Sequence, residues 1–194
     1  MKKIYVSFED IQRQVQDILR QMHNDNWRPD YIVGLTRGGL TPAVLLSQYL
    51  DIPCETLRVS LREHGQTESN CWMAEDAFGT VPFQEVESYG ARWDPARRKK
   101  ILIVDDINDS GATINWIVDD WQSSCMPNEP SWNTVWGHNV RFGTLYDNLA
   151  SDAKLSPTYT SEEINKAEDP SWVVFPWEEW WRRWNPTETY KGKN

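Results

Sequence analysis

The segment formed by residues 101–113, I-L-I-V-D-D-I-N-D-S-G-A-T, constrains the fold of this chain more than any other part of it. It opens with four consecutive apolar residues, which is typical of a strand buried on both faces of a parallel sheet. Two acids, Asp105 and Asp106, follow at once, and a turn of small and hydroxylated residues then leads into a helical pattern. Ligands of α/β proteins bind at the carboxyl ends of such strands. The segment therefore predicts an α/β fold with a ligand site at that edge of the sheet.

The rest of the chain alternates between strand and helix patterns. Ser7 and Asp10 have the spacing of a helix-capping pair, and apolar residues then recur at helical spacing. A glycine turn separates the next apolar run from a second helix, which we expect Thr41 to cap with Pro42 in the first position. Strands are expected at residues 4–6, 31–35, 56–60, 101–104, 142–146 and 172–175, and irregular structure at residues 61–98 and 123–139. This order predicts one domain, residues 1–194, with a mainly parallel, doubly wound sheet flanked by helices.

Composition narrows the classes of partner. A net charge of −9 and a pI near 4.8 argue against nucleic acid, because phosphate backbones select basic faces. No apolar run approaches the roughly 20 residues needed to span a bilayer, so we expect a soluble, cytoplasmic protein without a membrane partner. The 3 cysteines are far apart and form no C-x-x-C pair, which indicates neither a disulfide framework nor a zinc site. Of the 12 tryptophans, we expect most to pack and at most one or two to contact a ligand.

The turn after the acidic pair has the chemistry of a phosphate site. Gly111 and Ala112 allow backbone N–H groups to approach an anion. Ser110 and Thr113 can add hydroxyl donors, at a helix N-terminus that itself favours negative charge. Adjacent carboxylates would repel phosphate but suit sugar hydroxyls or Mg2+. The segment therefore favours a ribose phosphate over the alternative of a plain surface turn, and neither G-x-x-x-x-G-K-[ST] nor G-x-G-x-x-G occurs in the sequence.

Residues 101–113 resemble the phosphoribosyl-diphosphate signature of type I phosphoribosyltransferases, which is a hydrophobic strand, two acids and then D-[ST]-G-x-T. The resemblance implies that Asp105 and Asp106 hold the ribose hydroxyls and Mg2+, with Asp106 the main link to the metal. It implies that Asp109 faces N7 of a purine as general acid or base. The 5-phosphate would lie in the cradle formed by Ser110, Gly111, Ala112 and Thr113.

A second segment resembles another part of the same family. Residues 34–40, G-L-T-R-G-G-L, are similar to the family's diphosphate loop. The similarity implies that Arg37 supplies a cation and that Gly38 lets backbone amides approach the leaving diphosphate. This loop often contains a cis peptide bond in the family, which would fall between Thr36 and Arg37 here.

The resemblance narrows to the xanthine-guanine phosphoribosyltransferases of bacteria and their archaeal relatives, and it runs from Tyr5 to about Glu178. Near its end, W-V-V-F-P-W resembles the base-binding segment, which implies that Trp172 stacks on the purine and that the backbone of Val173 reads the base edge. Residues 147–194 would form a small hood and a tryptophan-rich tail. The implied activity is Mg2+-dependent transfer of the phosphoribosyl group of phosphoribosyl diphosphate to N9 of xanthine, guanine or hypoxanthine, in purine salvage. The implied assembly is a dimer or tetramer of identical chains.

Two departures from the family pattern leave points open. A lysine that binds the purine 6-oxo group usually follows the fifth predicted strand, and Asn148 takes the matching position here. An amide can donate to a carbonyl or accept from an amine, so selectivity for a 6-oxo purine stays open. Residues 61–98 look longer than in bacterial relatives and correspond to the family's mobile catalytic loop. Three arginines of this segment are candidates for phosphate contacts or form a solvated basic cluster: Arg92, Arg97 and Arg98.

Three other functions remain as alternatives. The first is a regulator that keeps this fold to sense phosphoribosyl diphosphate or a nucleotide, which the net charge and the intact Asp109 and Arg37 disfavour. The second is a phosphoribosyltransferase for another nitrogen base, such as adenine or orotate. The third is a diphosphokinase that makes phosphoribosyl diphosphate, which the absence of an internal duplication disfavours.

Overall fold

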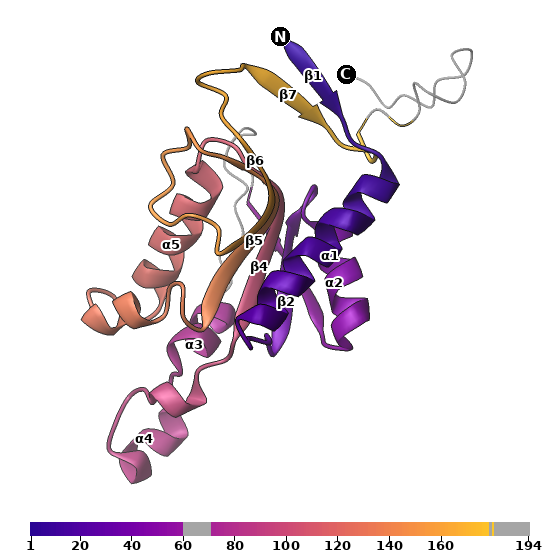
Figure 1. Cartoon of the computed structure of the whole chain (residues 1–194). Helices are drawn as coiled ribbons and strands as arrows, with labels where there is room; N and C mark the ends of the chain where they lie inside the picture. Colours follow the sequence, from indigo (N-terminus) through magenta and orange to yellow (C-terminus); the bar gives the residue numbers. More distant parts are fainter. Residues whose placement is uncertain (60–70, 179, 181–194) are drawn as a thin grey trace, which may run out of the picture.

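The computed structural model describes residues 1–59, 71–178 and 180 (Figure 1). Within these residues, helices and strands alternate along most of the chain, as the sequence predicts. In chain order they are β1 (Lys2–Tyr5), α1 (Phe8–Asn24), β2 (Tyr31–Thr36), α2 (Leu40–Leu50), β3 (Cys54–Arg58), α3 (Cys71–Phe78), α4 (Phe83–Tyr89), the 3-10 turn η1 (Pro95–Arg97), β4 (Ile101–Asn108), α5 (Ala112–Ser124), the 3-10 turn η2 (Pro130–Thr134), β5 (Val140–Asn148), β6 (Tyr159–Ile164) and β7 (Ser171–Val174).

The strands form two parallel sheets. The main sheet has the order β3-β2-β4-β5-β6, and every neighbouring pair in it is parallel. Strands β1 and β7 pair in parallel as a separate small sheet, which Figure 1 shows at the top, apart from the main sheet. The expected α/β architecture, a parallel sheet flanked by helices with a small hood near the C-terminus, is confirmed.

Helices cover both faces of the main sheet, with α1 and α2 on one side and α3 and α5 on the other (Figure 1). Side chains of a strand alternate between faces, so neighbouring residues of β4 enter different cores. Ile101 and Ile103 pack with α3 and α5, whereas Leu102 and Val104 pack with α1 and α2. Their exposed fractions are all 0–1%. The uninterrupted apolar run therefore reflects burial on both faces, as predicted.

The order of the strands reverses between β2 and β4. From β2 the chain continues to β3 on one side, and from β4 it continues to β5 on the other. The pairing of β2 with β4 ends at Gly34 and Val104. Beyond this point β2 stays paired with β3, and β4 stays paired with β5. In open α/β sheets such a reversal opens a crevice beyond the carboxyl ends of the strands.

Local capping explains where the first two helices begin. Ser7 and Asp10 form the expected capping box: the Ser7 hydroxyl accepts from the Asp10 N–H at 3.1 Å, and the Asp10 carboxylate accepts from the Ser7 N–H at 2.9 Å. The prediction that Thr41 caps α2 is wrong. Gly39 is the N-cap, and its carbonyl accepts from the N–H of Ala43 at 3.1 Å, so Thr41 already lies inside the first turn.

Part of the segment expected to be irregular is helical. Residues 71–97 contain α3, α4 and η1, while residues 60–70 lie outside the described residues. Met73, Ala74, Ala77 and Phe78 are 0–1% exposed and form one apolar face on α3. This helix was not predicted, because eight residues show only about two turns of the helical pattern and polar residues surround the apolar ones.

Strand β6 and turn η2 were also not predicted. Within the described part of the chain, β6 is an edge strand that pairs with β5 alone, and its sequence Y-T-S-E-E-I is largely polar. Turn η2 brings Trp132 against Phe78, with ring centroids 4.9 Å apart, and stacks it on Trp136 at 5.5 Å. These described tryptophans pack in the core, as the sequence predicts for most of them.

Candidate active site

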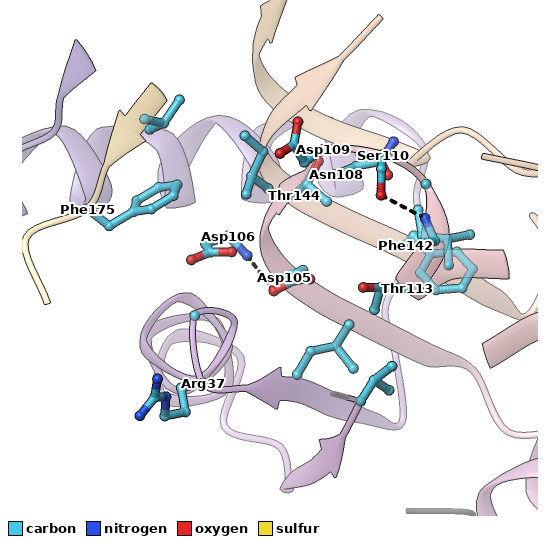
Figure 2. A pocket seen from close by; sticks show the side chains of 18 of the residues that line it. Arg37, Asp105, Asp106, Asn108, Asp109, Ser110, Thr113, Phe142, Thr144 and Phe175 are labelled. Atoms are coloured by element: carbon cyan, nitrogen blue, oxygen red, sulfur yellow. Dashed lines mark hydrogen bonds between the residues drawn. The ribbon is translucent and has the colours of Figure 1, made fainter. Parts of the chain in front are cut away.

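A cavity of about 460 Å³ lies at the reversal point of the main sheet. Apart from the three candidate arginines of residues 61–98, its lining includes every site residue named from the sequence except Asn148. Figure 2 shows that the labelled side chains come from the turn after β2, from the end of β4 and the turn that opens α5, from β5 and from the segment after β7. The predicted site residues in the lining are Arg37, Gly38, Asp105, Asp106, Asp109, Ser110, Gly111, Ala112, Thr113, Trp172 and Val173.

The acidic pair lies partly buried at the end of β4. The Asp106 N–H donates to the Asp105 carboxylate at 3.0 Å (Figure 2). Burial raises the pKa of Asp105 well above its ordinary value, and the neighbouring Asp106 carboxylate acts in the same direction. Burial raises the pKa of Asp106 to about 6, and the charge of Glu178 adds to this effect. Among the described residues neither carboxylate forms an ion pair, so the pair suits a bound cation or hydroxyl donors.

The turn after β2 lies directly against this acidic pair. A Cβ atom on Gly38 would come within 1.9 Å of the Asp106 carboxylate, so a residue with a side chain cannot lie here without displacing Asp106. A Cβ atom on Gly39 would lie 2.2 Å from the carbonyl oxygen of Val104. The peptide bond between Thr36 and Arg37 is cis, as the resemblance implies. The two glycines thus allow the Arg37 turn to approach the end of β4.

The turn that opens α5 presents backbone N–H groups to the cavity. Gly111 is the N-cap of α5 and has φ +83°, a left-handed conformation that favours glycine. A Cβ atom there would come within 2.3 Å of the Ala153 backbone nitrogen, so the turn packs tightly on the chain after β5. Having no side chain, Gly111 leaves the first turn of α5 uncapped, while the Ser110 hydroxyl accepts from the Ala112 N–H at 3.4 Å. This arrangement suits an anion at the helix N-terminus.

Lys166 enters the same cavity and was not predicted from the sequence. Its Nζ lies 2.8 Å from an oxygen of the Asp109 carboxylate and 5.8 Å from the ring centroid of Trp172. The Lys166 side chain is 18% exposed, so its ammonium is largely withdrawn from water. Lys166 follows β6, an edge strand that was not predicted. Without that strand, the sequence offered no reason to place Lys166 near Asp109.

Asn148 is the predicted site residue that does not line the cavity. It is 6% exposed, and its Nδ2 donates to the carbonyl oxygen of Asp109 at 2.8 Å. Its Oδ1 accepts from the backbone N–H groups of Ala150 at 3.2 Å and Lys166 at 3.0 Å. The side chain therefore joins three backbone segments behind the cavity wall.

Strand β7 and the segment after it also contribute to the cavity lining. Trp172 is 37% exposed on β7, while Val173 is 4% exposed beside it. Phe175 stacks on Trp177 with ring centroids 5.0 Å apart and an interplanar angle of 2°. The lining formed by the described residues does not include Arg92, Arg97 or Arg98.

The described residues contain no cluster of three or more His, Cys, Asp or Glu side chains that could hold a metal ion. Asp105 and Asp106 nevertheless fit Mg2+, because this ion often takes one or two protein carboxylates and completes its shell with water and substrate phosphates. None of the described helices is long and apolar enough to cross a membrane.

Comparison with known proteins gives concordant matches. The model of the phosphoribosyl transferase domain family matches residues 5–181. Xanthine phosphoribosyltransferase 1 of Saccharomyces cerevisiae is 26% identical over 195 residues, covering 91% of this chain and 90% of that protein. Xanthine-guanine phosphoribosyltransferase of Cereibacter sphaeroides is 27% identical over 183 residues, covering 91% of this chain and 87% of that protein. The crystal structure of purine phosphoribosyltransferase from Pyrococcus horikoshii Ot3 has the same fold, with a TM-score of 0.59 at 22% identity over 92% of this chain and 96% of that one.

Proposed function

The chain belongs to the phosphoribosyl transferase domain family, and from this premise we propose that it joins the 5-phosphoribosyl group of phosphoribosyl diphosphate to N9 of a purine. One observation carries the proposal. A single cavity holds an acidic pair, an uncapped helix N-terminus, a cationic glycine turn and an exposed tryptophan face. These are the partners that a diol, a monophosphate, a diphosphate and an aromatic base would need.

The substrate would lie across the reversal point of the sheet. The 5-phosphate would accept hydrogen bonds from the turn that opens α5, with Ser110 and Thr113 as hydroxyl donors. The diphosphate would lie at Arg37 and Gly38, and the ribose hydroxyls would donate to Asp105 and Asp106. When bound at the acidic pair, Mg2+ supplies positive charge that offsets the charge of the departing diphosphate.

The chain's own residues then position the two reactants. The bond from N9 to the anomeric carbon forms as the bond from that carbon to the diphosphate oxygen breaks. Asp109, at the edge of the cavity, takes the proton that N7 releases. Trp172, on the hood formed by β1 and β7, would stack on the base. Much of the rate enhancement would come from positioning and electrostatics.

A purine is the base class we propose, with xanthine, guanine or hypoxanthine as acceptors. The relatives with purine activities in their names are about a quarter identical to this chain, and the similarity spans most of both proteins. The exposed ring of Trp172, in the lining of the same cavity, suits a bicyclic base.

A panel assay tests this function. The purified chain is incubated with phosphoribosyl diphosphate, Mg2+ and each of xanthine, guanine, hypoxanthine and adenine, and nucleotide formation is measured. We expect at least one 6-oxo purine to be converted and diphosphate to be released in equal amount. Binding of phosphoribosyl diphosphate without conversion of any base, together with binding of RNA or DNA in a gel-shift assay, would favour the regulator instead.

A further inference from the structure

We propose that Asn115 is a positioning residue for the phosphate end of the site, and that it acts through the anchor segment, residues 150–154, which follows β5. The inference rests on the proposed function and deepens it. It gives a role to a side chain that lies outside the cavity lining, and it explains how the turn that opens α5 is kept in the form that an anion requires.

The turn that opens α5 does not fix its own conformation. An anion site made of backbone groups needs N–H groups directed inward and carbonyl oxygens directed outward. Gly111 has φ +83°, and no side chain caps α5, so the turn itself supplies little restraint. Rotation of the peptide between Ser110 and Gly111 would replace an N–H with a carbonyl oxygen, which repels phosphate. The orientation of this peptide therefore depends on contacts from outside the turn.

Those contacts come from the anchor segment and from the end of β5. The Asp152 N–H donates to the Ser110 carbonyl oxygen at 3.1 Å. The Asn148 side chain donates to the Asp109 carbonyl oxygen at 2.8 Å. Neither donor belongs to the lining formed by the described residues, so both carbonyl groups point away from the cavity. Since the C=O and N–H of a trans peptide point in opposite directions, the N–H groups of Ser110 and Gly111 are turned towards the cavity.

Asn115 holds the anchor segment in place from the first turn of α5. Its Nδ2 donates to the carbonyl oxygen of Asp152 at 2.9 Å, and its Oδ1 accepts from the Lys154 N–H at 2.7 Å. The backbone of Asp152 is thus fixed by Asn115 through its carbonyl oxygen, while its N–H holds Ser110. A displacement of the anchor segment would reach the turn directly, because a Cβ atom on Gly111 would already lie 2.3 Å from the backbone of this segment.

A second side chain ties the start of the turn to the same segment. Asn108 is 5% exposed, and its Nδ2 donates to the Ser151 hydroxyl at 3.0 Å and to the Asp147 carboxylate at 2.7 Å. Asn108 ends β4 and lies opposite Asp147 of β5 in the sheet register. The start of the turn is therefore held independently of Asn115. Loss of Asn115 should loosen the phosphate end and leave the acidic pair on β4 in place.

Calorimetry with two probes tests whether Asn115 acts on the phosphate end alone. Ribose 5-phosphate carries the phosphate and no diphosphate, whereas Mg2+ diphosphate carries the group proposed to lie at Arg37 and Gly38. Asn115→Ala removes two hydrogen bonds, so we expect it to weaken ribose 5-phosphate binding about fivefold to fiftyfold and to leave diphosphate binding within about twofold. Asn133→Ala is the matched control, because Asn133 is exposed on η2 and lies outside the cavity lining. It should bind both probes as the wild type does.

Kinetics and a second variant distinguish positioning from a general loss of structure. KM for phosphoribosyl diphosphate should rise more than KM for the base in Asn115→Ala. Asn115→Leu keeps the volume of the side chain without its hydrogen bonds and should behave like Asn115→Ala. Thermal unfolding checks that each variant folds. An equal loss of affinity for the two probes, or unchanged affinity for ribose 5-phosphate in a folded variant, would overturn the inference, as would the failure of both variants to fold.

The same measurements separate this inference from the proposed function, because neither probe requires turnover. An active wild type whose Asn115→Ala variant binds ribose 5-phosphate normally refutes the role of Asn115 and leaves the proposed function standing. A wild type that converts no base, but whose Asn115→Ala variant loses affinity for ribose 5-phosphate alone, refutes the function and supports the role of Asn115. A wild type that converts no base and binds neither probe refutes both.

Discussion

At the scale of single residues, the ligand-binding role proposed for Asp106 comes with a cost in folding stability. Its carboxylate lies against the backbone of Gly38, beside Asp105 and near Glu178. No described lysine or arginine forms an ion pair with it. Burial raises its pKa to about 6, which means that the ionised form is less stable in the folded chain than in the unfolded one.

The substitution Asp106→Asn should therefore stabilise the free protein and impair binding. The pKa in the folded state lies above the ordinary value of 3.8, so the ionised carboxylate destabilises the fold above about pH 6. We expect the free energy of unfolding at pH 8 to rise by roughly 1–2 kcal/mol, and the gain to shrink towards pH 5 as wild-type Asp106 becomes protonated. Thermal unfolding at the two pH values measures this. Calorimetry with Mg2+ and phosphoribosyl diphosphate should show a large loss of affinity, and unchanged affinity would contradict the role given to Asp106.

Asp109→Asn should separate turnover from binding. Removing a general acid or base lowers kcat by about 10²–10⁴, while KM for phosphoribosyl diphosphate should change by no more than a few fold. Steady-state kinetics with both substrates provide the measurement. Asp119→Asn is the control, because Asp119 pairs with Lys154 at the surface. Near-normal turnover in Asp109→Asn would reject Asp109 as the proton acceptor.

Residues of the site differ in how far they can be predicted from the sequence. Asp105, Asp106 and the turn that follows them are consecutive, because one strand and one helix N-terminus carry the whole cradle. Lys166 reaches Asp109 across 57 positions, and only the pairing of β5 with β6 brings them together. The departure at Asn148 was visible in the sequence, but its three backbone partners were not.

At the scale of elements, Arg98 connects α3 to η2 beside the aromatic rings of Phe78, Trp93 and Trp132. Its guanidinium donates to the carbonyl oxygens of Phe78 at 3.3 Å and Thr134 at 3.1 Å, and to the Thr134 hydroxyl at 2.8 Å. It also lies 5.6 Å from the Phe78 ring centroid and 5.7 Å from that of Trp93. These contacts indicate a structural role for Arg98, which joins α3 to η2. They do not support the phosphate contact considered for it from the sequence.

Arg98→Met should accordingly lower stability and leave substrate binding intact. Loss of several hydrogen bonds to carbonyl oxygens should reduce the free energy of unfolding by about 1–3 kcal/mol. KM for phosphoribosyl diphosphate should stay within about twofold. Denaturant unfolding and kinetics together test this expectation. Arg97→Met provides the comparison, because Arg97 pairs with Glu85 at the surface and should matter by about 1 kcal/mol or less. A selective rise in KM for Arg98→Met would restore the phosphate role.

Helices and strands with a well-buried apolar face could be predicted from the sequence, whereas those without a clear apolar pattern could not. Strand β4 is buried on both faces and α1 has a capping box and a clear apolar stripe, so both were identified. Strand β6 lies at the sheet edge with a polar sequence, and α3 has eight residues, which gives the helical period little room to show.

At the scale of the whole molecule, strand alternation was sufficient to predict the parallel sheet, since parallel neighbours need crossover connections. The pairing of β1 with β7 could not be predicted, because nothing in the sequence of two short, distant strands indicates which strand each one pairs with. This pairing places Lys3 beside Trp172 and Ile4 beside Val173. The wall proposed to hold the base therefore depends on the first residues of the chain.

Ile4→Pro should consequently weaken base binding from outside the cavity. Proline disfavours strand pairing because it lacks the N–H and has a fixed φ. We expect KM for the base to rise about fivefold or more, with KM for phosphoribosyl diphosphate within about twofold. Ile4→Val keeps the strand and should behave as wild type. Equal changes in both constants would show that β1 supports the whole fold instead of the base wall.

The small sheet also sets an order of events during synthesis. Its strands are joined at one end by the ion pair between Lys2 and Asp169, which are 167 positions apart. A nascent chain that has emerged as far as β6 contains every strand of the main sheet but not the partner of β1. The turn proposed to hold the phosphate can thus fold on the ribosome, whereas the surface proposed to receive the base is completed only after β7 has emerged.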